Sequence, residues 1–491
     1  MSPGVALLRT EFPAMLNPCV TMPHGIYQLT AVLERRGIEV AAALDMQIVR
    51  RHDVRRRLEE IAALRPDVIG LSAVSNQRPL VHEVADFFRK RLPDARIVAG
   101  GPLVNAARAG VMDVPALDFA IVGEGEESFP ALVEALAAGA DCRDIPGLIY
   151  REAGAVRENP SRVLSVPLEE LPFITWDRVD FARYGKFLSM CMRRSPYAAL
   201  FTSRGCPFHC INCHNIFGTK FRGRSPDHVL SEMHMLRSRY GLRRFEILDD
   251  NFNWDYDRAC EILSRMRDEL PGASLGFGNG VRADRIDENF IRLLKSVNCY
   301  LLGIPVETVT PRLQKILRKN LDLAKVEETI RLARRYGIHT WGYFMIGLPT
   351  ETPEEMESTV RYAERVDIDF IAVQTASPYE GTKLREMLGD SLASSVEVGN
   401  AHANYTPDRV SMEAINNRKL RAMRAQLVNP RNWYFLYNMA TWRLWWLGPR
   451  RVASHVLAIV AETVFRRRVF TAKIFEQERD AISREIRGTL R

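Results

Sequence analysis

Short apolar runs alternate with amphipathic stretches along most of the chain. Uninterrupted apolar runs of this length are typical of strands buried on both faces, and apolar residues recurring every three or four positions indicate helices. The pattern predicts strands at 4–9, 38–44, 67–72, 96–99 and 119–122, and helices at 24–36, 53–64, 79–92 and 126–137. Residues 1–140 are therefore expected to form a doubly wound, Rossmann-like parallel sheet in an α/β fold.

The same alternation begins again near residue 197. The pattern predicts strands at 197–202, 244–248, 274–278, 300–306, 340–346 and 370–375, with a helix at 226–240 after the first of them. Six strand–helix repeats over residues 196–390 predict a partial (β/α)6 TIM-like barrel, whose site lies at the carboxyl ends of its strands. A proline-punctuated segment, 141–195, is expected to connect the two domains.

Residues 391–491 differ in kind, and we expect a basic, aromatic-rich helical region there. Four of the seven tryptophans fall between residues 433 and 446, and arginines interrupt the apolar stretches before they reach the roughly 20 residues that span a bilayer. One interpretation is a helix lying in a membrane interface; the other is a helical cap on the barrel with a solvated basic face. Binding to nucleic acid is the weakest interpretation and is not expected.

The charge distribution and the cysteine content indicate the cellular compartment that is expected for the protein. Residues 401–491 hold 17 Lys and Arg against 7 Asp and Glu, a local +10, so the remainder carries −2 of the net +8. The eight cysteines do not form a disulfide framework, because three are clustered and five are scattered. No signal peptide is expected, because residues 1–9 lack a basic start followed by an apolar run and a cleavage site. A cytoplasmic protein is expected, with peripheral association at the inner membrane face if the tail binds lipid.

Three cysteines stand together in a CxxxCxxC motif after the first strand of the second domain. Cys206, Cys210 and Cys213 have the spacing that holds three corners of a [4Fe–4S] cluster and leaves the fourth iron for a substrate or cofactor. Zinc remains an alternative, because His209 or His214 is near enough in sequence to supply a fourth ligand. The spacing favours the cluster.

Small residues follow the predicted strands of the first domain, where ligands of doubly wound sheets bind. Ser72, Ser75, Gly100 and Gly101 would let a flat, bulky ligand approach the backbone, with Glu124 after the next strand. Ordinary strand-to-helix turns explain the same residues equally well.

The second domain resembles the radical S-adenosylmethionine (SAM) superfamily. The three cysteines match its cluster ligands, and the segment 347–352 (Gly-Leu-Pro-Thr-Glu-Thr) is similar to the family's Gly-Leu-Pro-Gly-Glu-Thr. The segment before Glu307 is one residue longer than in the family. The resemblance implies SAM contacts from Asp249 and Asp250 at the amine, Arg282 at the carboxylate, Glu307 at the ribose, and Lys319 downstream.

The first domain resembles the cobalamin-binding domains fused ahead of radical SAM domains, through residues 98–102 and 121–126. The Asp-x-His-x-x-Gly motif that replaces the lower cobalt ligand in many cobalamin proteins is absent. His24 lacks the preceding aspartate, and we interpret it as a helix-start residue. The resemblance implies cobalamin bound without histidine; a domain that kept the fold and lost the cofactor is the alternative.

Together the resemblances imply a cobalamin-dependent radical SAM enzyme. The expected reaction is methylation of an unactivated carbon in a hydrophobic, lipid-linked or natural-product substrate, with a reductant such as flavodoxin or ferredoxin. A non-methylating enzyme that forms rings or oxidises is one alternative, and a non-catalytic iron–sulfur or corrinoid sensor is another. No residue is assigned as catalytic.

Overall fold

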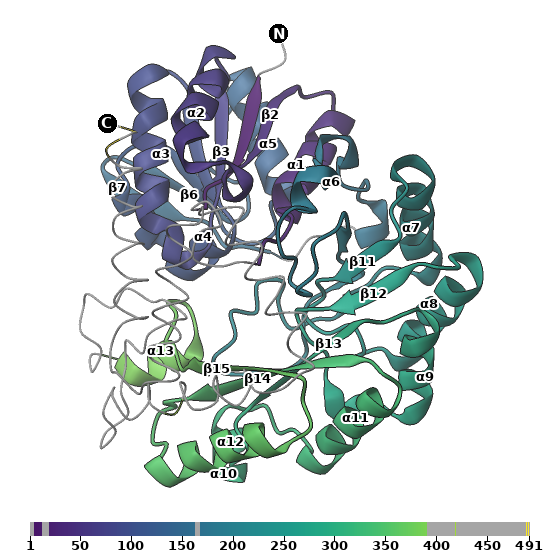
Figure 1. Cartoon of the computed structure of the whole chain (residues 1–491). Helices are drawn as coiled ribbons and strands as arrows, with labels where there is room; N and C mark the ends of the chain where they lie inside the picture. The colour runs from purple at the N-terminus through teal and green to yellow at the C-terminus, as the bar shows by residue number, and fades with distance from the viewer. Residues whose placement is uncertain are drawn as a thin grey trace.

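The computed structural model of the chain describes residues 4–11, 19–162 and 167–389, together with Arg418, Gly488 and Leu490. Two α/β domains lie one above the other, the first in purple and blue and the second in teal and green (Figure 1). The predicted helical region at 391–491 lies outside the described residues apart from those three. None of the helices in the described part is both long and apolar enough to cross a membrane.

The first domain is built on a seven-stranded sheet, and the predicted doubly wound fold is confirmed. The order is β2 (Val40–Asp45), β1 (Val5–Arg9), β3 (Val68–Ser72), β4 (Arg96–Gly100), β5 (Phe119–Ile121), β6 (Leu148–Glu152) and β7 (Ala155–Glu158). Strands β1 to β5 are parallel. The covering helices are α1 (His24–Arg35), α2 (Val54–Ala63), α3 (Arg78–Arg91), α4 (Pro102–Ala107) and α5 (Gly125–Ala138).

The strand order reverses at β1, which pairs with β2 on one side and with β3 on the other. Ligands of doubly wound sheets bind at such a reversal, outside the carboxyl ends of the strands. We call the carboxyl ends of β1, β3 and β4 the rim of the first sheet.

The segment expected as a connector begins differently from the expectation. Its first part forms the β6–β7 hairpin, which joins the first sheet antiparallel to β5. The four residues of β7 are mostly exposed, so the apolar run that marks the other strands is missing. Residues 167–195, which include the short helix α6 (Phe181–Tyr184), pack between the domains.

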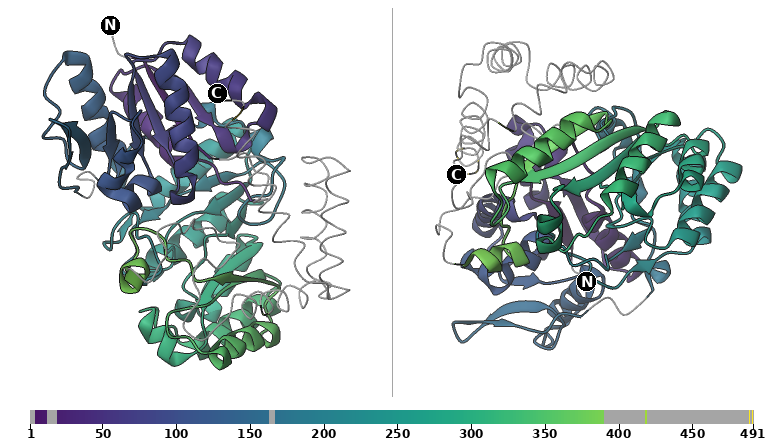
Figure 2. Two further views of the ribbon diagram at one scale, coloured as in Figure 1. Left: turned by 90° about the vertical axis from the view of Figure 1, so that its left-hand side faces the viewer. Right: turned by 90° about the horizontal axis from the view of Figure 1, so that it is seen from below.

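The second domain has a six-stranded, fully parallel sheet in nearly sequential order, which confirms the partial barrel. The order is β15 (Phe370–Thr375), β14 (His339–Ile346), β13 (Leu301–Glu307), β12 (Ser274–Phe277), β11 (Arg244–Ile247) and β8 (Ala198–Leu200). Its helices are α7 (Pro226–Tyr240), α8 (Tyr256–Glu269), α9 (Glu288–Ser296), α10 (Pro311–Ile316), α11 (Leu323–Arg335), α12 (Pro353–Arg365) and α13 (Lys383–Leu388). Seen from below, they wrap the outer face of the sheet (Figure 2).

The carboxyl ends of the strands in both sheets face the boundary between the domains. Arg204, just after β8, is ion-paired with Glu124, just after β5. On the other side of the boundary, Gly381, after β15, lies against the backbone of Ala106 in α4. The two regions where each fold binds ligands therefore face each other.

Candidate cofactor and active site

The three cysteines lie on a loop closed by a two-stranded ladder. Strand β9 (Ser203–Arg204) pairs antiparallel with β10 (Arg222–Gly223), with Arg204 opposite Arg222, and we call residues 205–221 the cysteine loop. Gly205 opens it with a φ of +86°, and a Cβ there would collide with the carbonyl oxygen of Lys220. A residue without a side chain is therefore required directly before the first cysteine.

The three thiols are close enough to influence one another. Burial raises the pKa of each thiol, and that of Cys206 reaches about 11 through burial with smaller contributions from Asp250, Cys213 and Cys210. Within the described ranges, no three His, Cys, Asp or Glu side chains converge on a point suited to one metal ion. A [4Fe–4S] cluster makes no such demand, because each thiolate binds a different iron. The thiols thus fit a cluster, whose irons would hold them deprotonated.

Charged side chains from the ends of β11, β12 and β13, together with Lys319 after α10, surround the cysteines. Lys319 Nζ donates to Glu307 Oε1 over 2.9 Å, and both side chains are largely buried. Burial raises the pKa of Cys210; Glu307 also raises it, whereas Lys319 and Arg282 lower it. Burial likewise raises the pKa of Cys213, which Asp250 and Glu307 raise and Lys319 lowers. The structure therefore gathers four of the predicted SAM contacts around the thiols.

The extra residue before Glu307 is absorbed by a bulge in β13. The register with β14 shifts between Pro305, opposite Tyr343, and Glu307, opposite Phe344. Glu307 also has a φ of +67°, an uncommon conformation for a residue with a side chain. A bulge re-aims the side chains that follow it, so Glu307 reaches Lys319 despite the longer segment.

The two neighbouring aspartates after β11 hold the start of the cysteine loop. Asp249 is 1% exposed and accepts hydrogen bonds from the backbone N–H and hydroxyl of Thr202 and the hydroxyl of Ser203, over 2.5–2.6 Å. Asp250 Oδ2 accepts one bond from the N–H of Gly205 over 3.1 Å, and burial raises the pKa of Asp250 to about 6. Of the two aspartates predicted to contact the SAM amine, Asp250 therefore accepts fewer hydrogen bonds from the protein.

Arg282 packs against Phe208 of the cysteine loop. Its guanidinium lies 3.9 Å from the ring centroid of Phe208, and its Nε donates to Asp284 over 2.9 Å. Phe208 in turn meets Trp254 edge to face. Phe208 thus holds Arg282 against the loop through a cation–π contact.

The segment around α13 contacts the opposite side of the loop. Leu384 N donates to the carbonyl of Ile211 over 2.8 Å, and the rings of His214 and Tyr379 lie 5.3 Å apart. His214 is thus engaged with an aromatic ring.

The rim of the first sheet carries residues with small side chains or none, as the sequence indicates. A Cβ at Gly100 would meet no atom of this structure within 4 Å, whereas one at Gly101 would press on Ser72 Oγ. Ser72 ends β3, and Ser75 begins the short helical turn that follows it. The open space at Gly100 fits a bulky, flat cofactor lying on the rim, whereas Gly101 is required by the packing of β3 against the turn.

Glu124 has partners that sequence reasoning missed. Its carboxylate accepts from Arg204 over 2.6 Å and from Arg222 over 2.5 Å, and Glu126 accepts from Arg204 over 2.7 Å. Both glutamates belong to the first domain and both arginines to the second. An arginine directly before Gly-Cys and a Gly-Glu-Gly-Glu repeat were visible in the sequence, yet nothing in it paired them. A cobalamin contact from Glu124 remains a prediction.

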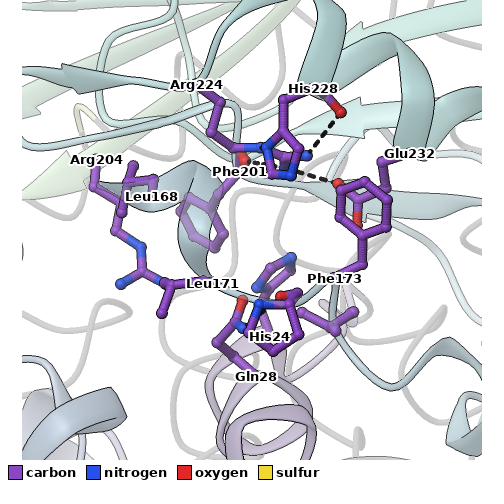
Figure 3. Close-up of a pocket in the computed structure, with 12 residues that line it drawn as sticks. His24, Gln28, Leu168, Leu171, Phe173, Phe201, Arg204, Arg224, His228 and Glu232 are labelled. Carbon is purple, nitrogen blue, oxygen red and sulfur yellow. Dashed lines mark hydrogen bonds and ion pairs between the residues drawn. The ribbon is translucent and has the colours of Figure 1, made fainter. Parts of the chain in front are cut away.

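His24 lies beside this interface, at the start of α1 as predicted. Figure 3 shows it with Gln28 on one wall of a pocket, opposite Arg224 and His228. Its ring meets Trp176 and Phe201 edge to face, and within the described residues its Nε2 has no hydrogen-bond partner. Burial, reinforced by Arg204 and Arg224, lowers the pKa of His24 to about 3, so the ring is neutral.

Comparison with known proteins agrees with the fold of both domains. Residues 200–363 match the radical SAM superfamily, and residues 20–133 match the B12 binding domain. An uncharacterised methyltransferase of Pyrococcus horikoshii is 32% identical over 65% of this chain and 69% of the relative. Cytidylyl-2-hydroxyethylphosphonate methyltransferase of Streptomyces wedmorensis is 29% identical over 78% and 80%.

A solved structure supports the same arrangement of domains. The radical SAM methyltransferase TsrM of Kitasatospora setae, with cobalamin and a [4Fe–4S] cluster bound, superposes with a TM-score of 0.66 at 22% identity. The superposition covers 84% of this chain and 81% of TsrM. The chain is a two-domain α/β enzyme with facing cofactor regions. It belongs to the cobalamin-dependent radical SAM enzymes, and its cofactors are a [4Fe–4S] cluster, SAM and cobalamin.

Proposed function

We propose that the chain is a C-methyltransferase in which Cys206, Cys210 and Cys213 hold the cluster. The observation that carries this proposal is the place of the cysteine loop, at the carboxyl end of β8 and tied to the end of β5 in the B12 domain. When bound, the cluster supplies the electron that splits a C–S bond of SAM, and cobalamin supplies the methyl carrier. The protein holds a substrate carbon between the two domains and keeps water out.

The residues around the cysteines bind and orient SAM. Asp250, with one N–H donor on its carboxylate, accepts from the ammonium group, and Arg282 donates to the SAM carboxylate. Glu307 keeps one carboxylate oxygen for the ribose hydroxyls while the other accepts from Lys319. Because these groups come from different strand ends, SAM is fixed at several points, and distance then selects the hydrogen that leaves the substrate.

A hydrophobic substrate is supported by the inner face of the barrel. Trp341, Tyr343 and Met345 alternate with buried residues on β14, so they share the face opposite the helices, and each is half-buried. The rings of Trp341 and Tyr343 lie 5.2 Å apart. An aromatic wall of this kind favours a planar or aliphatic substrate.

A lipid-linked substrate and peripheral membrane binding rest on the C-terminal sequence, where Arg466, Arg467 and Arg468 follow an apolar stretch. Sedimentation with anionic vesicles tests them. The full chain should pellet with anionic vesicles and less with neutral ones, and changing the three arginines to glutamine should release it. A full chain that stays in the supernatant with both vesicles contradicts this part of the proposal.

The main test uses anaerobically purified protein. Iron, sulfide and corrinoid content, together with the visible spectrum, should report one cluster and one corrinoid per chain. Reduced protein should convert SAM to both S-adenosylhomocysteine and 5′-deoxyadenosine, and methyl-labelled SAM should place label in the product. Cleavage without methyl transfer would favour a non-methylating enzyme. An intact cluster with neither SAM product would favour a sensor.

A further inference from the structure

A buried ion-pair network crosses the domain boundary beside the cysteine loop. It consists of Arg204, Arg222, Glu124 and Glu126, which we call the interdomain clamp. The exposed fractions of the four side chains are 7%, 15%, 5% and 8%. Two positive and two negative charges balance, as buried charges require. Such a network costs desolvation energy and is retained where a fixed geometry matters.

The clamp includes one arginine at each end of the cysteine loop. Arg204 leaves β9 two residues before Cys206, and Arg222 lies opposite it on β10, at the other end of the loop. Glu124 accepts from both arginines, through different carboxylate oxygens, while Glu126 accepts from the second Nη of Arg204. Arg204 also lies over the ring of Phe217, within the loop, at 5.1 Å. The loop is therefore attached to the first domain as a closed unit.

The glutamates lie at the start of α5 in the first domain. Glu124 is the residue before α5 and Glu126 lies in its first turn, where negative charge is stabilised by the helix dipole. The guanidinium groups of Arg204 and Arg222 keep their charge in a protein, so the clamp always presents two cations to the two carboxyl groups.

Other polar links also cross the boundary in the described part. Tyr197, directly before β8, donates its hydroxyl to the carbonyl of Val20 over 2.8 Å. Arg78 and Glu380 approach to 3.7 Å, with side chains 29% and 51% exposed, and exposed pairs of this kind contribute little. Neither link involves the cysteine loop, whose two ends are tied to the first domain by the clamp.

We propose that Arg204, held by Glu124 and Glu126, is a positioning residue that sets the cysteine loop at a fixed distance from the cobalamin-binding rim. This inference rests on the proposed function, because two outcomes of SAM depend differently on that distance. Reductive cleavage to 5′-deoxyadenosine needs SAM and the cluster, both held by the barrel. Methyl donation, which leaves S-adenosylhomocysteine, needs SAM to meet a carrier held by the other domain.

The experiment compares Arg204→Lys and Glu126→Gln with wild type as reconstituted holoenzymes, using SAM alone as the probe. Small displacements of reacting groups cost up to about 100-fold in rate, so S-adenosylhomocysteine formation should fall by at least about tenfold. Formation of 5′-deoxyadenosine should stay within about twofold, since the barrel still holds its parts. Glu126→Gln keeps the test available if the lysine variant fails to fold.

A second readout does not depend on turnover. Pulsed electron paramagnetic resonance on protein with both the cluster and the cobalt paramagnetic measures the distance between them. Wild type should give one narrow distribution, and both variants should broaden or displace it while iron and corrinoid contents stay the same.

The matched control is Arg224→Lys. Arg224 pairs with Glu232 over 2.7 Å with side chains 9% and 2% exposed, but both partners belong to the barrel. Its product ratio and distance distribution should match those of wild type. A parallel fall of both SAM products in the clamp variants, or an unchanged distance distribution, would overturn the inference. If wild type forms 5′-deoxyadenosine only, the proposed function fails, and the distance measurement alone decides the clamp.

Discussion

Lys319 and Glu307 form an ion pair within 2.9 Å beside the cysteine loop, although twelve residues and the helix α10 separate them in sequence. Glu307 reaches this position through the β13 bulge and a left-handed backbone conformation. Backbone conformations of this kind cost about 1–3 kcal/mol and tend to occur at functional sites. The pair thus marks the part of the barrel rim where SAM is expected.

Lys319→Met should weaken SAM binding about tenfold without emptying the cluster. The variant leaves Glu307 without its cation in a largely buried place, and the loss of one charge-assisted bond accounts for an effect of about 1.4 kcal/mol. Equilibrium dialysis of the reconstituted protein with SAM measures it. The control is Lys325→Met, exposed on α11, which should bind SAM like wild type. Unchanged affinity in Lys319→Met would remove Lys319 from the site.

Gly205→Ala should prevent cluster assembly, lowering iron per chain at least about threefold, because the added carbon collides with backbone rather than with a movable side chain. Gly218→Ala is the matched control. Its φ is +78° but a Cβ there meets nothing within 4 Å, so it should cost about 1 kcal/mol and keep the cluster. Iron and sulfide analysis after anaerobic reconstitution compares the two. Equal iron contents would show that the tight turn at Gly205 is not needed.

The sequence carried most of the fold because parallel strands buried on both faces have an unmistakable apolar pattern, as in Val5–Arg9 and Val68–Ser72. The sequence did not predict the strand Ala155–Glu158, because this exposed edge strand has no such pattern. The family resemblance implied the grouping of Asp250, Arg282, Glu307 and Lys319. The topology accounts for the first three, since they follow or end parallel strands whose carboxyl ends meet at one edge, whereas Lys319 follows α10.

The pairing of Arg204 with Glu126 could not be predicted in the same way. The two residues are 78 positions apart and belong to different domains, and no local rule fixes how two domains dock. Nor could the sequence show that the Asp249 carboxylate accepts hydrogen bonds from Thr202 and Ser203, because that depends on side-chain direction at a strand end.

His24 should make the protein less stable in mild acid. Its folded pKa of about 3 lies below the 6.5 of an exposed histidine, so below pH 6.5 the unfolded chain takes up a proton that the folded chain does not. Stability is therefore present above pH 6.5 and is lost as the pH falls toward 3, by about 2 kcal/mol between pH 7 and pH 5. Denaturant unfolding of wild type and His24→Phe at both pH values measures the difference. His82→Phe, on the exposed face of α3, should keep the wild-type dependence; a His24→Phe variant that keeps it as well would contradict the prediction.

Glu351 should make the protein more stable, not less, as the pH falls. Its contribution can therefore be measured separately from that of His24. Its side chain lies in the turn before α12, and Oε2 accepts from the N–H groups of Gly347 and Leu348 over 2.6 and 2.8 Å. Burial raises the pKa of Glu351 from 4.5 to about 7, despite those two bonds. The folded chain thus holds a proton more tightly than the unfolded chain. The stability that this proton contributes is present below pH 4.5 and is lost as the pH rises through 7.

Glu351→Gln isolates that contribution, because one amide oxygen accepts both N–H bonds as Oε2 does and the group no longer titrates. Between pH 8 and pH 5, wild type should gain about 2 kcal/mol in free energy of unfolding relative to the variant. Denaturant titrations at the two pH values give this difference, in which the contribution of His24 cancels. Glu354→Gln, exposed in the first turn of α12, should show no such gain. A wild-type protein that loses stability relative to Glu351→Gln on acidification would mean that the carboxyl is charged in the folded state, and that the turn holds an anion rather than a proton.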